Sequence, residues 1–137
     1  MSWLVLANLG VILALTLTPI HWPVDPRVGA AGGVTCDISR IGPASIDVYL
    51  AVRDPTLNVL VFTPLGVLIG QLDRRQHRGL LVAAAVMLPL GIELVQALVA
   101  PLGRACQGGD VFDNLAGLLI GIAIGVVWRR ARRAAQT

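Results

Sequence analysis

Long apolar runs separated by polar links dominate the chain, and their spacing predicts four helices. The runs cover approximately residues 3–19, 57–72, 80–100 and 111–128. At about 1.5 Å of rise per residue, the third run reaches across the roughly 30 Å hydrocarbon layer of a bilayer. We therefore predict an all-α, polytopic membrane protein in which one domain, residues 1–137, has four transmembrane helices.

The stretch between the first two runs, residues 20–55, has a different character. It is rich in proline, glycine and acidic residues, which predicts a long loop with at most a short helix or strand around residues 46–52. Loops of this length in small domains are usually either functional or poorly ordered. Both alternatives stay open.

Composition and charge then narrow the possible functions. The chain is 55% hydrophobic and 14% charged, with a net charge of +3, as is typical of a small membrane protein. All 11 basic residues are arginines, and aromatic residues make up only 4%, so we expect no nucleic-acid partner. The two histidines have no partners at ligand spacing, and we expect no metal and no cofactor.

The arginines are concentrated in the link after the second run and in the C-terminal tail, at Arg74, Arg75, Arg78, Arg129, Arg130, Arg132 and Arg133. The positive-inside rule then predicts that both termini are cytoplasmic and that the long loop lies outside. Cys36 and Cys106 both fall in outer loops under this topology. An oxidising compartment would allow them to form a disulfide, with two unrelated thiols as the equally weighted alternative.

Polar residues interrupt the apolar pattern at one depth. Glu93 and Gln96 share a helical face near the outer end of the third run, and a carboxylate inside a span costs about 2.5 to 3.5 kcal/mol, so Glu93 should face protein or water. Residues of the neighbouring helices and loop reach the same depth, which predicts a polar pocket lined by Asn58, Glu93, Gln96, Arg104, Asp110 and Asn114. Arg104 is the expected countercharge for Glu93 or Asp110, and for Asp113 a helix-capping role is favoured.

Glycines repeat at four-residue steps in the second and fourth runs. Gly66 and Gly70 make one such step, and Gly117, Gly121 and Gly125 continue the pattern. Small residues at this spacing predict faces on which two helices approach closely, within one chain or in a homo-oligomer.

Three ordered motifs resemble a known family. They are Asn58-x-x-x-Phe62-x-Pro64-x-Gly66, Glu93-x-x-Gln96, and Arg104 followed by Asp110-x-x-x-Asn114-x-x-Gly117. Together they resemble the VanZ-like family of small bacterial membrane proteins. The resemblance implies a helical domain of the bacterial inner membrane and a link to teicoplanin resistance.

Three functional hypotheses follow. The first is an outer-leaflet polar pocket that binds membrane lipids, a cell-wall precursor or a glycopeptide. The second is a membrane enzyme that acts on a lipid-linked substrate with Glu93 as general acid or base, although no nucleophile accompanies it at motif spacing. The third is a structural, oligomeric component that associates through the glycine faces.

Overall fold

The computed structural model describes residues 2–19, 36–72, 75–99, 102 and 106–136. The prediction of a mostly helical chain is confirmed. The elements are α1 (Ser2–Leu17), β1 (Cys36–Asp37), α2 (Ile46–Leu50), α3 (Asp54–Gly70), α4 (Arg75–Leu98), β2 (Cys106–Gln107) and α5 (Gly108–Ala134).

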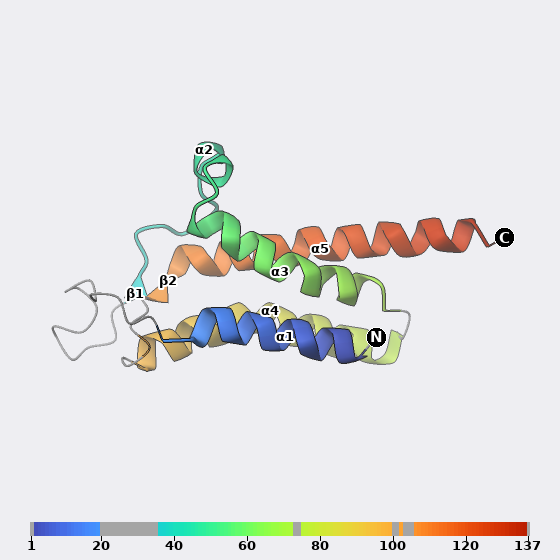
Figure 1. The fold of residues 1–137 in the computed structure, drawn as a ribbon, viewed down its shortest axis with the longest axis horizontal. Coiled ribbons are helices and arrows are strands. Elements are labelled where there is room, and N and C mark those ends of the chain that lie inside the picture. Colours follow the sequence, from blue (N-terminus) through green and yellow to red (C-terminus); the bar gives the residue numbers. More distant parts are fainter. Residues whose placement is uncertain (1, 20–35, 73–74, 100–101, 103–105, 137) are drawn as a thin grey trace.

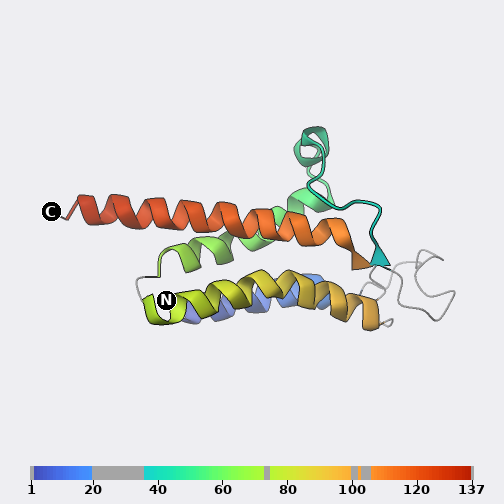
Figure 2. The same ribbon diagram turned by 180° about the vertical axis from the view of Figure 1, so that it is seen from behind.

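The four long helices form two layers (Figures 1 and 2). Helices α3 and α5 lie side by side in one layer, and α1 and α4 form the other. Both ends of the chain lie at one end of the bundle, whereas β1 and β2 lie at the opposite end. Helix α2 stands beside the α3/α5 layer near that opposite end.

Glycines set the separation of α3 and α5. A Cβ on Gly117 would lie 2.1 Å from the carbonyl oxygen of Val59, and one on Gly121 would lie 2.1 Å from that of Thr63. The same close approach to backbone atoms occurs at Gly66, Gly70 and Gly125. Residue numbers increase in the same direction along both helices at these contacts, from Val59 with Gly117 to Thr63 with Gly121, so α3 and α5 run parallel. Only glycine allows the two backbones to come this close.

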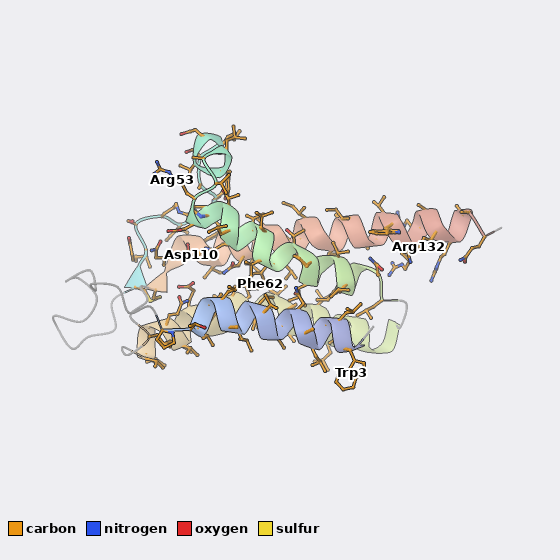
Figure 3. The ribbon with its side chains drawn as sticks, viewed as in Figure 1. Trp3, Arg53, Phe62, Asp110 and Arg132 are labelled. Atoms are coloured by element: carbon orange, nitrogen blue, oxygen red, sulfur yellow. A yellow bond between two sulfur atoms is a disulfide. The ribbon has the colours of Figure 1, made fainter. Side chains whose placement is uncertain are left out.

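Apolar side chains fill the space between the two layers. Phe62 from α3, Ile12 from α1 and Leu118 from α5 are each fully buried, and Figure 3 shows Phe62 between the layers. The remaining core residues are Leu65, Ile69, Ala85 and Ile92. This core joins the layers and holds the polar ends of α3, α4 and α5 in fixed positions relative to one another.

Several helix boundaries differ from those expected. Helix α3 begins at Asp54 because Pro55 occupies the first turn, where its missing N–H would have no helical partner anyway. Helix α5 continues to Ala134, since arginine and alanine are good helix formers. The short helix expected around residues 46–52 is α2, and the two-residue β pair is an addition to the predicted all-α fold.

Two segments of the described chain are long and apolar enough to cross a bilayer, Gly79–Leu98 in α4 and Gly108–Ala134, the whole of α5. Helices α1 and α3 are also apolar but have only 16 and 17 residues. Helix α3 contains Pro64, whose ring lacks the N–H that would donate to the preceding turn.

A disulfide joins the long loop to the start of α5. Cys36 and Cys106 are bonded, with their Cα atoms 4.6 Å apart. They are also register partners in the parallel β1–β2 pair, in which Asp37 faces Gln107. The bridge therefore fixes the loop that follows β1 over the N-terminal end of α5.

Reduction of this disulfide should destabilise the fold by about 2 kcal/mol. The bond closes a loop with a sequence separation of 70 residues, but apolar helices that keep their secondary structure in detergent already restrict the unfolded chain, so we take the low end of the usual range. Thermal unfolding in detergent with and without a reductant measures the effect. The paired Cys36→Ser and Cys106→Ser variant should match the reduced protein and should no longer respond to reductant, and an unchanged midpoint would contradict the expectation.

Candidate functional site

Asp113 is the centre of a buried ionic cluster. Its side chain is fully buried, and Nη2 of Arg40 donates to Oδ2 of Asp113 at 2.6 Å. The second terminal nitrogen of Arg40 contacts Oδ1 of Asp113 at 3.4 Å and donates to the carbonyl oxygen of Gly42 at 3.0 Å. A forked contact of this kind matches the planar guanidinium to the carboxylate.

Tyr49 completes this cluster from α2. Its hydroxyl donates to Oδ1 of Asp113 and accepts from the backbone N–H of Ala44 at 3.1 Å. The hydroxyl of Thr56 donates to the carbonyl oxygen of Tyr49 at 2.7 Å, which ties α2 to the first turn of α3. One carboxylate on α5 thus anchors both the loop after β1 and α2.

The charges of the cluster reinforce one another. The hydrogen bond to Asp113 raises the pKa of Arg40 above its ordinary value, which already keeps the guanidinium charged at neutral pH. Burial, followed by the hydrogen bond to Asp113, raises the pKa of Tyr49. The Tyr49 hydroxyl therefore remains protonated and keeps its role as a donor at neutral pH.

A second carboxylate lies one helical turn earlier on α5. Oδ1 of Asp110 is 3.7 Å from Nη2 of Arg40, and the side chain of Asn58 on α3 hydrogen-bonds to Asp110. Figure 3 shows Asp110 near the β-strand end of the molecule, where the two helix layers face each other. Asp110 therefore connects the ionic cluster to the space between the layers.

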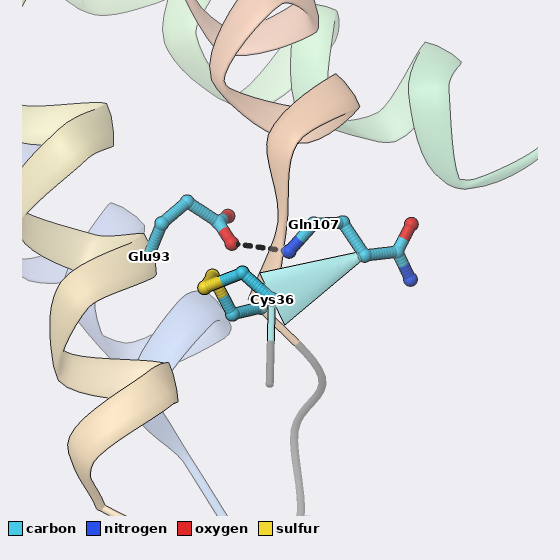
Figure 4. Close-up of a disulfide and its surroundings, with 4 residues drawn as sticks. Cys36, Glu93 and Gln107 are labelled. Atoms are coloured by element: carbon cyan, nitrogen blue, oxygen red, sulfur yellow. Dashed lines mark hydrogen bonds between the residues drawn. A yellow bond between two sulfur atoms is a disulfide. The ribbon is translucent and has the colours of Figure 1, made fainter. Parts of the chain in front are cut away.

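Glu93 approaches this space from α4. Glu93 is only 6% exposed, and its Oε2 accepts a hydrogen bond from the backbone N–H of Gln107 at 2.8 Å. Figure 4 shows this hydrogen bond beside the disulfide of Cys36 and Cys106. Asp110 repels Glu93 electrostatically, and in the described part of the chain no arginine pairs with Glu93.

Asn114 is buried without a full set of partners. It lies four residues after Asp110, on the same face of α5, and is only 2% exposed. Its Oδ1 has no hydrogen-bond partner among the described residues. A buried amide oxygen left without a donor is costly, on the order of 1–3 kcal/mol, so a group from outside the described chain would gain by satisfying it.

The predicted pocket residues divide into three groups. Asn58, Glu93, Asp110 and Asn114 lie at the β-strand end of the bundle, and we refer to these four as the acceptor cluster. Gln96 is turned away toward α1, where its Nε2 donates to the carbonyl oxygen of Thr16 at 2.9 Å. Arg104 lies outside the described residues.

Two residues of the site have no counterpart in the sequence-based prediction. Arg40 and Tyr49 lie 73 and 64 residues from Asp113 in the chain, in a stretch without helical or strand periodicity. The capping role favoured for Asp113 is wrong, because α5 begins at Gly108 and Asp113 points into the protein as an ionic partner. The signal available in the sequence was Asp113 itself, a second carboxylate three residues after Asp110, which sequence reasoning assigned to helix capping.

Oxygen acceptors outnumber donors in the acceptor cluster. Asp110 lies within electrostatic reach of Glu93 and one helical turn from Asn114, and Arg40, whose Nη2 is 3.7 Å from Oδ1 of Asp110, is hydrogen-bonded to Asp113. Within the described ranges, no group of three or more His, Cys, Asp or Glu residues could hold a metal ion. The arrangement is suited to a polar group that brings its own N–H or O–H donors.

Comparison with known proteins supplies one relationship. A family model described as VanZ/LLP1 matches residues 5–129, which is nearly the whole chain. No curated protein and no solved structure matches the chain. The two bilayer-length apolar segments are in keeping with a membrane protein, and the match over residues 5–129 shows that the chain belongs to the VanZ/LLP1 family.

Proposed function

We propose that the four long helices all span the bilayer, with both termini in the cytoplasm and the β-strand end outside. The common location of the two chain ends supports this arrangement. So does the arginine-rich end of α5, which carries Arg132 and Arg133 in its last turn, since basic residues favour the cytoplasmic side. Reporter fusions at both termini that were active only outside would overturn the orientation.

We propose further that the acceptor cluster binds a donor-bearing polar group of a cell-envelope amphiphile or a glycopeptide. The observation that carries this proposal is the buried Oδ1 of Asn114, which has no hydrogen-bond partner among the described residues and lies one helical turn from the Asp110 carboxylate. Buried acceptors need donors, and hydroxyl, amide or ammonium groups of an envelope lipid, a cell-wall precursor or a glycopeptide supply them. Arg104 stays a predicted anion-binding neighbour of the cluster.

The VanZ family is associated in general with teicoplanin resistance, and we propose that binding at the acceptor cluster produces protection of this kind. Association with an envelope component at the outer face places the protein where a glycopeptide meets its target. The proposal needs no covalent chemistry, so residues of the cluster act by hydrogen bonding and by their charge.

Teicoplanin susceptibility in a glycopeptide-sensitive host tests the proposed function. We expect the unaltered chain to raise the inhibitory concentration severalfold, and Glu93→Ala or Asn114→Ala to return it to the level of an empty vector. Asp47→Ala is the matched control because Asp47 is an exposed carboxylate on α2 and is not one of the four acceptor-cluster residues. Membrane levels of all variants must agree.

Two outcomes would contradict the proposal. If the unaltered chain gives no protection, the family association does not extend to this protein. If protection is present but both cluster variants retain it, the acceptor cluster is not the functional site, and the buried oxygen of Asn114 is then a structural feature.

A further inference from the structure

Four large apolar side chains in and around α2 are left largely exposed by the described part of the chain. Ile41, Ile46, Leu50 and Val52 are 71%, 76%, 78% and 64% exposed, and we call these four residues the apolar ridge. Single exposed hydrophobic residues are ordinary, but four large ones between residues 41 and 52 indicate a surface that meets another apolar phase. The ridge lies in the loop stretch, outside the long apolar helices.

The ridge is held rigidly rather than left on a loose loop. Tyr49 of α2 donates to the buried carboxylate of Asp113 and is itself bound by Ala44 and Thr56. Arg40, next to Ile41, makes the ion pair with the same carboxylate. Tyr49 and Arg40 therefore hold this segment against the protein, while the side chains of Ile46 and Leu50, about 60° and 100° around α2 from Tyr49, stay exposed.

The backbone at Val52 adds an independent observation. Val52 has a φ of 49°, a left-handed conformation that β-branched residues rarely adopt and that glycine or asparagine adopts at lower cost. This residue turns the chain between α2 and α3. Strain of this kind persists where the surroundings or a function require it, and here the bulky apolar side chain points outward instead of into a core.

The position of α2 identifies what covers the ridge. Helix α2 is seen nearly end-on in Figures 1 and 2, so its axis runs across the long helices, beside the start of α3. The apolar surface continues along the first turns of α3 through Leu57 and Leu60, which are 49% and 56% exposed. Arg53, in the turn between α2 and α3, extends toward the β-strand end (Figure 3). A helix lying across the bundle at the end of its apolar zone, with a cation on the outer side, matches an interfacial segment.

We propose that the apolar ridge inserts into the boundary between headgroups and acyl chains, so that α2 is an interfacial membrane anchor beside the acceptor cluster. The occupant of the ridge is lipid. The assignment of this lipid to the outer leaflet rests on the orientation given under Proposed function. Contact of the ridge with acyl chains does not depend on that orientation. The anchor would hold Tyr49, and through it Asp113, at a constant depth.

A fluorescent label on single cysteines tests this placement. Both native cysteines are in the disulfide, so an environment-sensitive nitrobenzoxadiazole label reacts only with the new thiol of Ile46→Cys, Leu50→Cys or Asp47→Cys. The labelled proteins are reconstituted in phosphatidylcholine vesicles with or without acyl-chain bromine. Ile46 and Leu50 lie about 40° apart on one helical face, whereas Asp47 lies about 100° from Ile46 and about 60° from Leu50, at the polar edge of that face, and serves as the control.

We expect bromine to quench the labels at Ile46→Cys and Leu50→Cys roughly two- to threefold more than the label at Asp47→Cys, as for a helix whose apolar face is buried about 5–10 Å in the interface. Val52→Asn should reduce that quenching without lowering the unfolding midpoint, because asparagine accepts the left-handed backbone. Equal quenching at all three positions would overturn the proposal. So would weak quenching combined with emission that depends on the protein-to-lipid ratio, which indicates a second copy on the ridge.

The result is separable from that of the susceptibility test. Bromine in the acyl chains of both leaflets quenches the labels whichever way the protein is inserted, so an inverted orientation leaves the ridge test valid. Likewise, loss of teicoplanin protection in the acceptor-cluster variants carries no information on lipid contact at α2. Variants are compared only where membrane level and the intact disulfide match those of the unaltered protein.

Discussion

Gly121→Ala is expected to lower the free energy of unfolding by about 3 kcal/mol, the upper part of the usual range for overpacking. The added Cβ would lie 2.1 Å from the carbonyl oxygen of Thr63 and 2.9 Å from the Cα of Gly66. Both contacts are with backbone, so no change of rotamer relieves them. The only escape is to move α3 and α5 apart, which also loosens the contacts of Gly117 and Gly125.

A matched substitution elsewhere separates this steric effect from helix propensity. Gly91 is also helical, but a Cβ built there has no neighbour within 4 Å, so Gly91→Ala should be neutral or stabilising by up to about 1 kcal/mol. Thermal unfolding in detergent compares the two variants. If Gly121→Ala unfolded at the same temperature as the unaltered protein, α3 and α5 could not approach as closely as described.

Local sequence pattern was sufficient to predict the helical character of the chain. Apolar runs give the long helices because every backbone polar group in such a segment must be satisfied within it. Four-residue glycine spacing placed Gly66, Gly70 and Gly117 on close-approach faces, which is where the structure has them in contact. Spacing could not say which helices would pair, since the same faces also suit an oligomer.

The site was less accessible to sequence reasoning because its main contacts are not local. Polarity at one depth pointed to Asn58, Glu93, Asp110 and Asn114, but the depth argument gave no direction, and Gln96 turns toward α1. In the sequence, Arg40 is only one of the arginines in the long loop. The Cys36–Cys106 bond and the β pair place its segment over α5. Its pairing with Asp113 depends on that long-range closure, for which no periodicity exists.

Arg40→Ala is the second substitution with a large expected effect, again about 3 kcal/mol of destabilisation. Removing one partner of a buried ion pair typically costs 3–5 kcal/mol because the other charge stays buried alone. Arg40 is 33% exposed but Asp113 is fully buried, so we take the lower limit. Arg53→Ala is the control, since Arg53 is an exposed arginine of the same segment between β1 and α3.

A double substitution tests whether charge, rather than shape, is the cause. Arg40→Met combined with Asp113→Leu removes both charges and should recover part of the stability lost in Arg40→Ala, since buried pairs are often replaceable by apolar residues but the hydrogen bond from Tyr49 is lost with the Asp113 carboxylate. Tyr49→Phe in the otherwise unaltered chain should cost about 1.5–3 kcal/mol, the range for a hydrogen bond to a charged group.

The double variant Arg40→Met with Asp113→Leu should still release α2, because the Tyr49 hydroxyl has lost its acceptor. Bromine quenching of the label at Ile46→Cys would then become less position-specific at an unfolding midpoint above that of Arg40→Ala. Unchanged quenching would show that the apolar ridge, and not the ionic cluster, determines where α2 lies.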